Sequence, residues 1–303
     1  MTVRSIMEET TVNNSQDSTR SLLRSPWLYF AVTFAWTWLF WGLGIALKVS
    51  MESAGGFAIL FLGVLGPMLT GIGFTYLTRD RAGRRDYWKR IVDVKRIGLT
   101  WFAVILLFTP ILNLLAAGID VLVGGQGATW GPSLLNAVSN PISLLFSALF
   151  ATLIPFIEEL GWRGYVLDRL QEKRNALVSS LILNVVWSLW HLPMFFIPDS
   201  YQASLGVGTL EFWLFILGVV PLGFAFTWIY NNTRRSILAV ILFHAMVNFT
   251  GELIAVSVRA DTIAMVLWFV AVAGITIIWG AKTLTHSNDT ADVALLDGQH
   301  AAA

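Results

Sequence analysis

A small set of polar side chains inside the long apolar stretches of this sequence has the chemistry of a hydrolytic site. In chain order they are Glu158, Glu159, Arg163, His191, His244 and Asn248. Inside a lipid bilayer an ionisable side chain is unfavourable by several kcal/mol unless it is paired or hydrated. Such side chains are therefore functional candidates by default, and their spacing decides which of them act together.

Helical spacing separates these side chains by role. Glu159 and Arg163 are four residues apart, on one helix face, in the order that favours an ion pair. Glu158 is rotated by about 100° from its neighbour, so it cannot share that pair. His244 and Asn248 are also four apart, which presents an imidazole and an amide side by side. We therefore expect the ion pair to brace the helix and Glu158 to remain available for chemistry.

A glutamate, two histidines and an asparagine can hydrolyse a peptide bond without a covalent intermediate. The carboxylate acts as general base or acid toward a water molecule, and a histidine shares the water or carries its proton to the leaving amine. A paired His and Asn donate hydrogen bonds to the tetrahedral oxyanion. The same Glu and His side chains could instead hold a zinc ion that activates the water. The residues leave both versions open.

The fifth apolar stretch carries a further polar stripe. Asn184, Ser188 and His191 are spaced i, i+4 and i+7 on one helix face. For Asn184 and Ser188 we expect ordinary hydrogen bonds between helices. A serine mechanism is disfavoured, because Ser188 has no obvious acid partner and the sequence contains no G-x-S-x-G motif. Neither intramembrane histidine begins an H-E-x-x-H metalloprotease motif.

The composition is that of a polytopic membrane protein. Of 303 residues, 56% are hydrophobic and only 13% are charged, about half the usual charged share. This excludes a disordered chain and disfavours a cytosolic enzyme. A net charge of +1 gives no reason to expect a nucleic-acid partner, and we predict none. The absence of cysteine excludes disulfides, thiolate metal sites and a cysteine nucleophile.

Apolar stretches of about 20 residues, the length that crosses a bilayer, occur eight times. We predict an all-α membrane helical bundle with spans near 27–48, 54–78, 97–122, 140–167, 176–197, 210–230, 236–256 and 262–281. The expected organisation is one membrane domain, residues 26–282, between disordered polar tails, residues 1–25 and 283–303.

Positive charges predict the orientation of the bundle. They cluster before the first span, at 79–96, at 169–174, and at Arg234 and Arg235. With eight spans and both termini in the cytosol, every cluster lies inside. The segment 79–96 also contains Tyr87 and Trp88; we expect a topogenic loop with an interfacial amphipathic piece, and a contact for acidic lipid or substrate is the alternative.

Three motifs on three separate predicted spans carry a resemblance to a known family. They are E-E-x-x-x-R from residue 158, W-x-x-x-H from residue 187 and H-x-x-x-N from residue 244. Together they resemble the CPBP intramembrane proteases. This CAAX-processing and bacteriocin-processing family, also called Abi proteins, includes the type II CAAX prenyl endopeptidase (Ras-converting enzyme). The motif-bearing core covers about residues 140–256.

The resemblance implies specific roles for the motif residues. Glu158 would activate water together with His191, while His244 and Asn248 would form the oxyanion site. Supporting roles fall to Glu159, Arg163 and Trp187. The family's second motif usually begins with Phe, so Trp187 is a departure that could alter the substrate pocket. Family members include metalloproteases and glutamate-dependent hydrolases, so zinc held by Glu158, His191 and His244 stays an open alternative.

We therefore expect a multi-pass intramembrane endopeptidase with an active site that opens toward the cytosol; if the source is a prokaryote, the membrane is the plasma membrane. Its partners would be membrane lipid and a membrane-associated peptide or protein, either a CAAX-type substrate carrying a prenyl group or a bacteriocin or pheromone precursor. Two other classes compete with this interpretation. One is a catalytically silent immunity or partner protein, and the other is a proton-coupled transporter with the same ionisable groups as its path.

Overall fold

The apolar stretches of the sequence form long helices. In residues 22–286, which the computed structural model describes, seven helical segments are long and apolar enough to cross a membrane. They are Pro26–Ala46, Ala54–Thr78, Leu99–Leu122, Ile142–Gln171, Ala176–Phe196, Leu210–Asn232 and Val258–Trp279. The shorter apolar helix Ile237–Leu253 occupies the place of the remaining predicted span. The prediction of an all-α polytopic bundle is confirmed.

The elements follow one another along the chain with short connections. The first half contains α2 (Pro26–Ala46), α3 (Ala54–Val64), α4 (Gly66–Thr78), α5 (Arg81–Val92), η1 (Val94–Arg96), α6 (Leu99–Leu122), β1 (Ala128–Trp130) and α7 (Pro132–Ser139). The second half contains α8 (Ile142–Gly161), η2 (Trp162–Val166), α9 (Leu167–Gln171), α10 (Ala176–Trp190), η3 (Leu192–Phe196), α11 (Tyr201–Leu205), α12 (Leu210–Asn232), α13 (Ile237–Leu253), β2 (Ile254–Val256) and α14 (Val258–Trp279).

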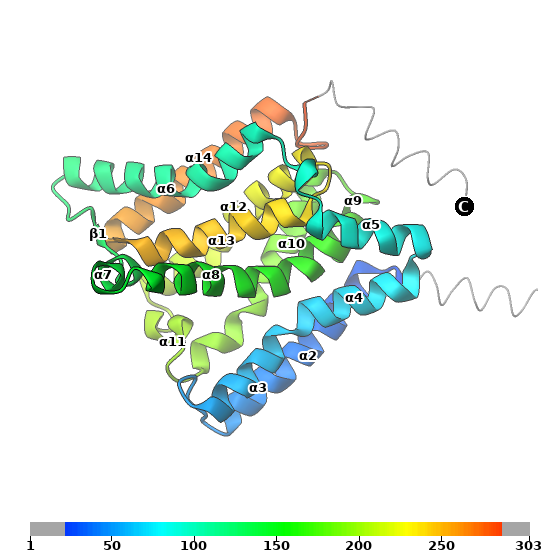
Figure 1. Ribbon diagram of the computed structural model, residues 1–303, viewed down its shortest axis with the longest axis horizontal. Helices are drawn as coiled ribbons and strands as arrows, with labels where there is room; N and C mark the ends of the chain where they lie inside the picture. Colours follow the sequence, from blue (N-terminus) through cyan, green and yellow to red (C-terminus); the bar gives the residue numbers. More distant parts are fainter. Residues whose placement is uncertain (1–21, 287–303) are drawn as a thin grey trace, which may run out of the picture.

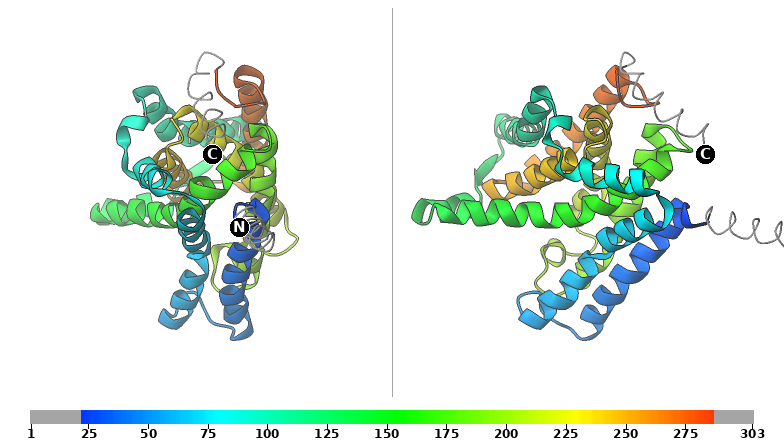
Figure 2. Two further views of the ribbon diagram at one scale, coloured as in Figure 1. Left: turned by 90° about the vertical axis from the view of Figure 1, so that its right-hand side faces the viewer. Right: turned by 45° about the vertical axis from the view of Figure 1, so that its right-hand side comes forward.

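Helix α8 runs across the middle of the molecule. It packs against α4 on one side and against α13 on the other (Figure 1). Two further views show α2, α3 and α4 below it and α6, α13 and α14 above it (Figure 2). Helix α10 packs against α12. The helices that carry the three sequence motifs, α8, α10 and α13, are thus held together by their neighbours.

The two short strands close one end of the bundle. They pair antiparallel, with Ala128 opposite Val256 and Trp130 opposite Ile254. Beside them the buried Asp120 of α6 accepts hydrogen bonds from the Gly127 backbone and the Ser257 hydroxyl, each at 2.8 Å. This polar cluster ties the end of α6 to the start of α14.

Two of the predicted basic clusters, 79–96 and 234–235, meet at the opposite end around the buried Asp168, which directly precedes the cluster at 169–174. The Asp168 carboxylate forms ion pairs with Arg79 at 2.9 Å, with Arg90 at 3.2 Å and with Arg235. The Tyr230 hydroxyl donates to the same carboxylate at 2.8 Å. The basic loops therefore share one face of the bundle, as the orientation argument requires. That this face is cytosolic stays a prediction.

Most of the two predicted tails lies outside the described residues. Residues 1–21 of the first tail and 287–303 of the second are not described. Within the second tail, Leu284 is buried in the core, and its carbonyl oxygen accepts a hydrogen bond from the Asn232 side chain at 2.6 Å. The last described residues therefore pack against the end of α12.

A close crossing of α4 and α8 fixes the position of the central helix. The Tyr29 hydroxyl donates to the Pro67 carbonyl oxygen at 3.2 Å, next to this crossing. A methyl group on Gly161 would overlap both of these groups, and one on Gly71 would lie 2.7 Å from the Gly161 Cα. Only hydrogen atoms fit between the two helices here, two residues from Glu159.

Gly161→Ala should therefore lower the free energy of unfolding by about 1–3 kcal/mol, the usual cost of overpacking a well-filled site. Thermal unfolding in detergent measures the change. Gly73→Ala is the matched control on α4, because its added methyl group meets no atom within 4 Å. Equal melting temperatures for the two variants would show that the crossing tolerates a wider separation.

Candidate active site

Glu159 is the centre of a buried charge network. Its carboxylate accepts two hydrogen bonds from Arg163 Nη1, both at 3.0 Å, so the ion pair expected from the i, i+4 spacing is present. Oε1 of the same carboxylate also lies 2.9 Å from Nδ1 of His244. Arg163 reaches further, from Nη2 to the Asn184 side-chain oxygen at 3.3 Å. One carboxylate thus connects α8 to α13 and, through the guanidinium, to α10.

Glu158 faces a different neighbour. Its side chain is buried, with 3% of the residue exposed, and Oε2 accepts a hydrogen bond from the Trp187 indole Nε1 at 2.6 Å. Trp187 belongs to α10, so this contact joins the second motif to the first. Arg163 lies over the face of the same indole, 5.1 Å from the ring centre. The two adjacent carboxylates therefore have separate partners, as their rotation around the helix predicts.

His191 lies at the point where α10 ends. The helix stops at Trp190, and the following turn contains Pro193, which cannot donate a backbone hydrogen bond. The His191 Nδ1 atom lies 2.8 Å from the Trp187 carbonyl oxygen. Because a carbonyl oxygen only accepts, Nδ1 carries the proton and Nε2 of the neutral imidazole keeps its lone pair. The half-buried ring can therefore accept a proton through Nε2.

His244 lies in the middle of α13, where the helix passes α8. Its ring packs edge to face with Trp187, with centroids 5.3 Å apart, and lies tilted against Phe226, with centroids 5.0 Å apart. With Nδ1 directed at Glu159, its Nε2 is the atom available to a substrate. Asn248 follows one turn later and is exposed. Within residues 22–286, Asn248 has no hydrogen bond to the other candidate residues, so its place in the site follows from its position on α13.

Helix α8 does not continue regularly beyond the carboxylates. Residues Trp162–Val166 form a π-turn, in which the backbone hydrogen bonds span five residues. Two carbonyl oxygens beside this turn accept hydrogen bonds from α5: the Tyr87 hydroxyl donates to Leu160 at 3.0 Å, and Arg90 donates to Gly164 at 3.3 Å. Burial raises the pKa of the Tyr87 phenol, which keeps the donor protonated. Helix α5 therefore supports the backbone just after Glu159.

The contribution of α5 was not expected from the sequence. The segment 79–96 indicated an interfacial amphipathic piece, and the described helix does have an exposed side with Trp88 and Lys89. Its opposite side, with Tyr87, Arg90 and Ile91, is buried. The one signal for this was a Tyr three residues before an Arg among the charges, a spacing that places both on one helix face.

Asn184 and Ser188 form the helix-to-helix hydrogen bonds that were expected. The Asn184 amide donates to the Val220 carbonyl oxygen at 3.2 Å, and the Ser188 hydroxyl donates to Ile216 at 2.7 Å. Gly223 permits this approach, since a side chain there would overlap Asn184. Both contacts hold α10 against α12, which fixes the rotation of the helix that carries Trp187 and His191.

The candidate metal ligands do not form a cluster around a common point. Among the residues that the structure describes, no three His, Cys, Asp or Glu side chains lie close enough together to hold a metal ion. One oxygen of Glu158 is engaged by Trp187. These side chains therefore do not form a ready metal site, and zinc held by Glu158, His191 and His244 stays a hypothesis.

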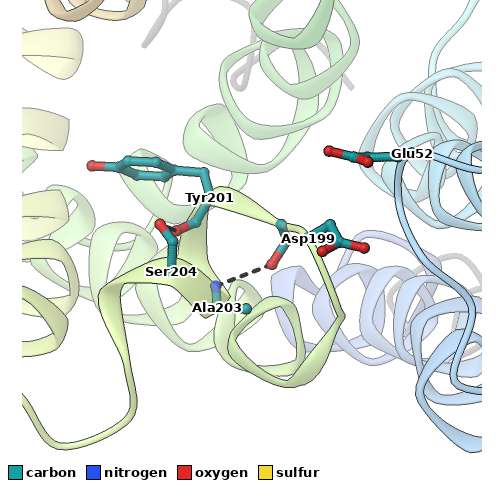
Figure 3. Close-up of a pocket in the computed structure, with 6 residues that line it drawn as sticks. Glu52, Asp199, Tyr201, Ala203 and Ser204 are labelled. Atoms are coloured by element: carbon teal, nitrogen blue, oxygen red, sulfur yellow. Dashed lines mark hydrogen bonds between the residues drawn. The ribbon is translucent and has the colours of Figure 1, made fainter.

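A cavity of about 430 Å³ lies elsewhere, between the α2–α3 connection and α11 (Figure 3). Glu52, Asp199, Tyr201 and Ser204 line it, together with Ser200 and Ala203. The Ser200 hydroxyl accepts a hydrogen bond from the Ala203 backbone at 3.0 Å, which caps the start of α11. None of the candidate catalytic residues lines this cavity, and it contains no histidine.

Comparisons with known proteins point to one family. Residues 140–250 match a family model described as type II CAAX prenyl endopeptidase Rce1-like. The chain is also 30% identical over 254 residues to the CAAX prenyl protease 2 of Methanococcus maripaludis. This alignment covers 83% of the chain and 93% of that protein. The segment matched by the family model contains all four predicted catalytic residues.

Arg163→Met should lower the free energy of unfolding by about 3–5 kcal/mol, because it leaves the Glu159 carboxylate buried without its cation. Denaturation in detergent measures this loss. Combining it with Glu159→Gln should cost less than the sum of the two single substitutions, since the unpaired charge is then absent. Lys173→Met, at an exposed side chain with no ion pair in residues 22–286, is the control. Strict additivity would contradict the pairing.

Proposed function

This chain belongs to the type II CAAX prenyl endopeptidase family, and from that membership we propose that it hydrolyses a peptide bond of a membrane-associated substrate. One observation supports the proposal most directly. Glu158, His191 and His244 come from three different helices, and each of them contacts Trp187: through its indole nitrogen, its carbonyl oxygen and its ring face, respectively. The groups needed for acid–base chemistry are therefore neighbours.

We propose that Glu158 and His191 activate the attacking water. Oε2 of Glu158 is occupied by the indole, so Oε1 is the oxygen that takes a proton from the water. Nε2 of His191 has its lone pair free and accepts a second hydrogen bond from the same water. As the water oxygen bonds to the peptide carbonyl carbon, its proton passes to the carboxylate. The carboxylic acid then protonates the leaving amine.

His244 and Asn248 stabilise the oxyanion in this proposal. Because Nδ1 of His244 is directed at the Glu159 carboxylate, Nε2 donates a hydrogen bond only when the imidazole carries both protons. The Asn248 amide adds a second, neutral donor one turn away. Donors of this kind act on the charge that develops in the transition state.

The proposed substrate is a protein or peptide tail at the membrane surface. The relative from Methanococcus maripaludis is called a CAAX prenyl protease, which suggests a prenylated C-terminal tail as the first substrate class to test. The basic face around Asp168 marks the side that we assign to the cytosol, because the positive clusters meet there. The active site would open toward that side.

Glu158→Gln should reduce hydrolysis about 100- to 10,000-fold, the usual contribution of a general base, because the amide cannot take the proton of water. The measurement is cleavage by the purified protein in lipid. The substrates are a panel of prenylated and unmodified membrane-anchored peptides, each offered with and without a strong chelator. Glu52→Gln, at an exposed carboxylate in the separate cavity, is the control and should cleave like the unmodified protein.

The two arms of this experiment answer different questions. If Glu158→Gln cleaves peptides at the rate of the unmodified protein, the assignment of Glu158 as the general base is wrong. Cleavage that survives the chelator supports water held by protein side chains, and cleavage that the chelator abolishes and zinc restores supports the metal alternative. If no peptide of the panel is cleaved in any arm, the result favours a catalytically silent immunity or partner protein.

His244→Ala and Asn248→Ala should each lower kcat by about 100- to 1000-fold with little change in KM, since oxyanion donors act in the transition state and not in substrate binding. Steady-state kinetics on a cleaved peptide separates the two parameters. A rise in KM at unchanged kcat would assign these side chains to substrate binding instead.

A further inference from the structure

Both the backbone and the side chain of Trp187 contact a proposed catalytic group. Its carbonyl oxygen accepts a hydrogen bond from His191 Nδ1 at 2.8 Å, and its indole Nε1 donates to Glu158 Oε2 at 2.6 Å. Any residue at this position supplies the carbonyl oxygen. The hydrogen bond to Glu158 Oε2, in contrast, needs a large ring side chain with a hydrogen-bond donor at its far end.

We propose that the Trp187 indole N–H is a positioning group for the water-activating carboxylate, an inference that rests on the proposed function. The hydrogen bond holds the Glu158 carboxyl plane and leaves Oε1 as the oxygen that no protein donor engages among the described residues, so Oε1 is the one that takes the proton of water. This hydrogen bond also retains the carboxylate next to the end of α10, where His191 begins the next turn. The Trp187 indole N–H therefore determines which oxygen of the Glu158 carboxylate takes the proton of water and which way that oxygen points.

The alternative explanation is that a buried indole simply needs a hydrogen-bond partner. Burial alone does not select a carboxylate as that partner. The equally buried indole of Trp41 donates to the Leu60 backbone carbonyl oxygen at 3.0 Å, and among the described residues the Nε1 atoms of Trp162, Trp190 and Trp228 have no protein partner. Pairing with a charged side chain is therefore particular to Trp187 among the buried tryptophans of residues 22–286.

The remaining contacts of the Trp187 ring do not depend on its nitrogen. The ring lies under the Arg163 guanidinium, against Phe226 with centroids 5.6 Å apart, and against the His244 ring. A phenyl ring can make contacts of the same type. Replacement of Trp187 by Phe thus removes the N–H and part of the ring, and a sulfur-for-NH analogue removes the N–H alone.

The kinetic test uses both replacements at position 187. Trp187→Phe and the isosteric benzothienyl-alanine analogue should each lower kcat by between about tenfold and about a hundredfold, the range for a hydrogen bond to a charged group, while KM stays nearly constant. The control is Trp228→Phe, which removes a buried indole N–H outside the site that has no hydrogen-bond partner within residues 22–286. It should keep the kcat of the unmodified protein.

Two kinetic outcomes overturn the inference. One is an unchanged kcat in both replacements. The other is a loss in Trp187→Phe that the isosteric analogue does not share, because ring volume is then the cause. Melting temperatures measured in parallel identify any variant that fails to fold, and the analogue, which keeps the ring volume, then carries the comparison.

A spectroscopic measurement separates this inference from the proposed function. In protein labelled with ¹⁵N-tryptophan, the Trp187 indole resonance is the one missing from Trp187→Phe. It should move upfield in Glu158→Leu, which has no acceptor, while the Trp228 resonance stays in place. A stationary Trp187 resonance overturns the hydrogen bond. If the Trp187 indole resonance shifts in Glu158→Leu but the unmodified protein cleaves no substrate, the hydrogen bond that positions Glu158 is retained and the proposed hydrolytic function is overturned.

Discussion

The contact of Glu159 with Arg163 and His244 is the interaction on which the arrangement of the motif helices depends. A carboxylate with no exposed surface inside a membrane bundle is strongly unfavourable without cations or hydrogen-bond donors. Arg163 comes from the same helical segment, but the second donor comes from α13, so α13 must lie against α8 at this level. The guanidinium also reaches Asn184 on α10. The need to pair one charge therefore brings three helices together, and Glu158 follows because it is the next residue in the chain.

Several backbone features hold this network in place from outside. The close crossing at Gly71 and Gly161 sets the path of α8 just before the π-turn. The π-turn then interrupts the regular ladder of backbone hydrogen bonds, and Tyr87 and Arg90 of α5 donate to carbonyl oxygens beside it. A π-turn next to functional side chains is a recurrent device, because it changes side-chain direction without ending the helix. Here it lies in the segment that contains Arg163.

The sequence predicted what depends on local pattern and missed what depends on how helices rotate against one another. The length of the apolar stretches predicted the membrane spans, and the i, i+4 spacing of Glu159 and Arg163 predicted their ion pair. Each of these features is a property of a single helix. The contact between Glu159 and His244 needs the depth and rotation of α8 and α13, which no single segment encodes. From the sequence, Trp187 was a departure from the family motif that could alter the substrate pocket, whereas its contact with Glu158 depends on how α10 is rotated against α8. The supporting role of α5 was missed because the positive-inside rule already accounts for a basic segment between two spans, so its charges gave no reason to expect buried contacts.

The different partners of the two carboxylates favour hydrolysis over proton transport. Glu159 is bound to a guanidinium and an imidazole, which together fix the position of its carboxylate. Glu158 is bound to a neutral indole, which orients one oxygen and leaves the other free to gain and lose a proton. A transport path needs groups that hand a proton from one to the next across the bundle. Here His191 and His244 each direct Nδ1 at a fixed acceptor, the Trp187 carbonyl oxygen and the Glu159 carboxylate respectively, so neither ring passes a proton to the other through Nδ1. In the proposed hydrolysis, one carboxylate oxygen of Glu158 and the two Nε2 atoms act instead on one water molecule and the peptide carbonyl that it attacks.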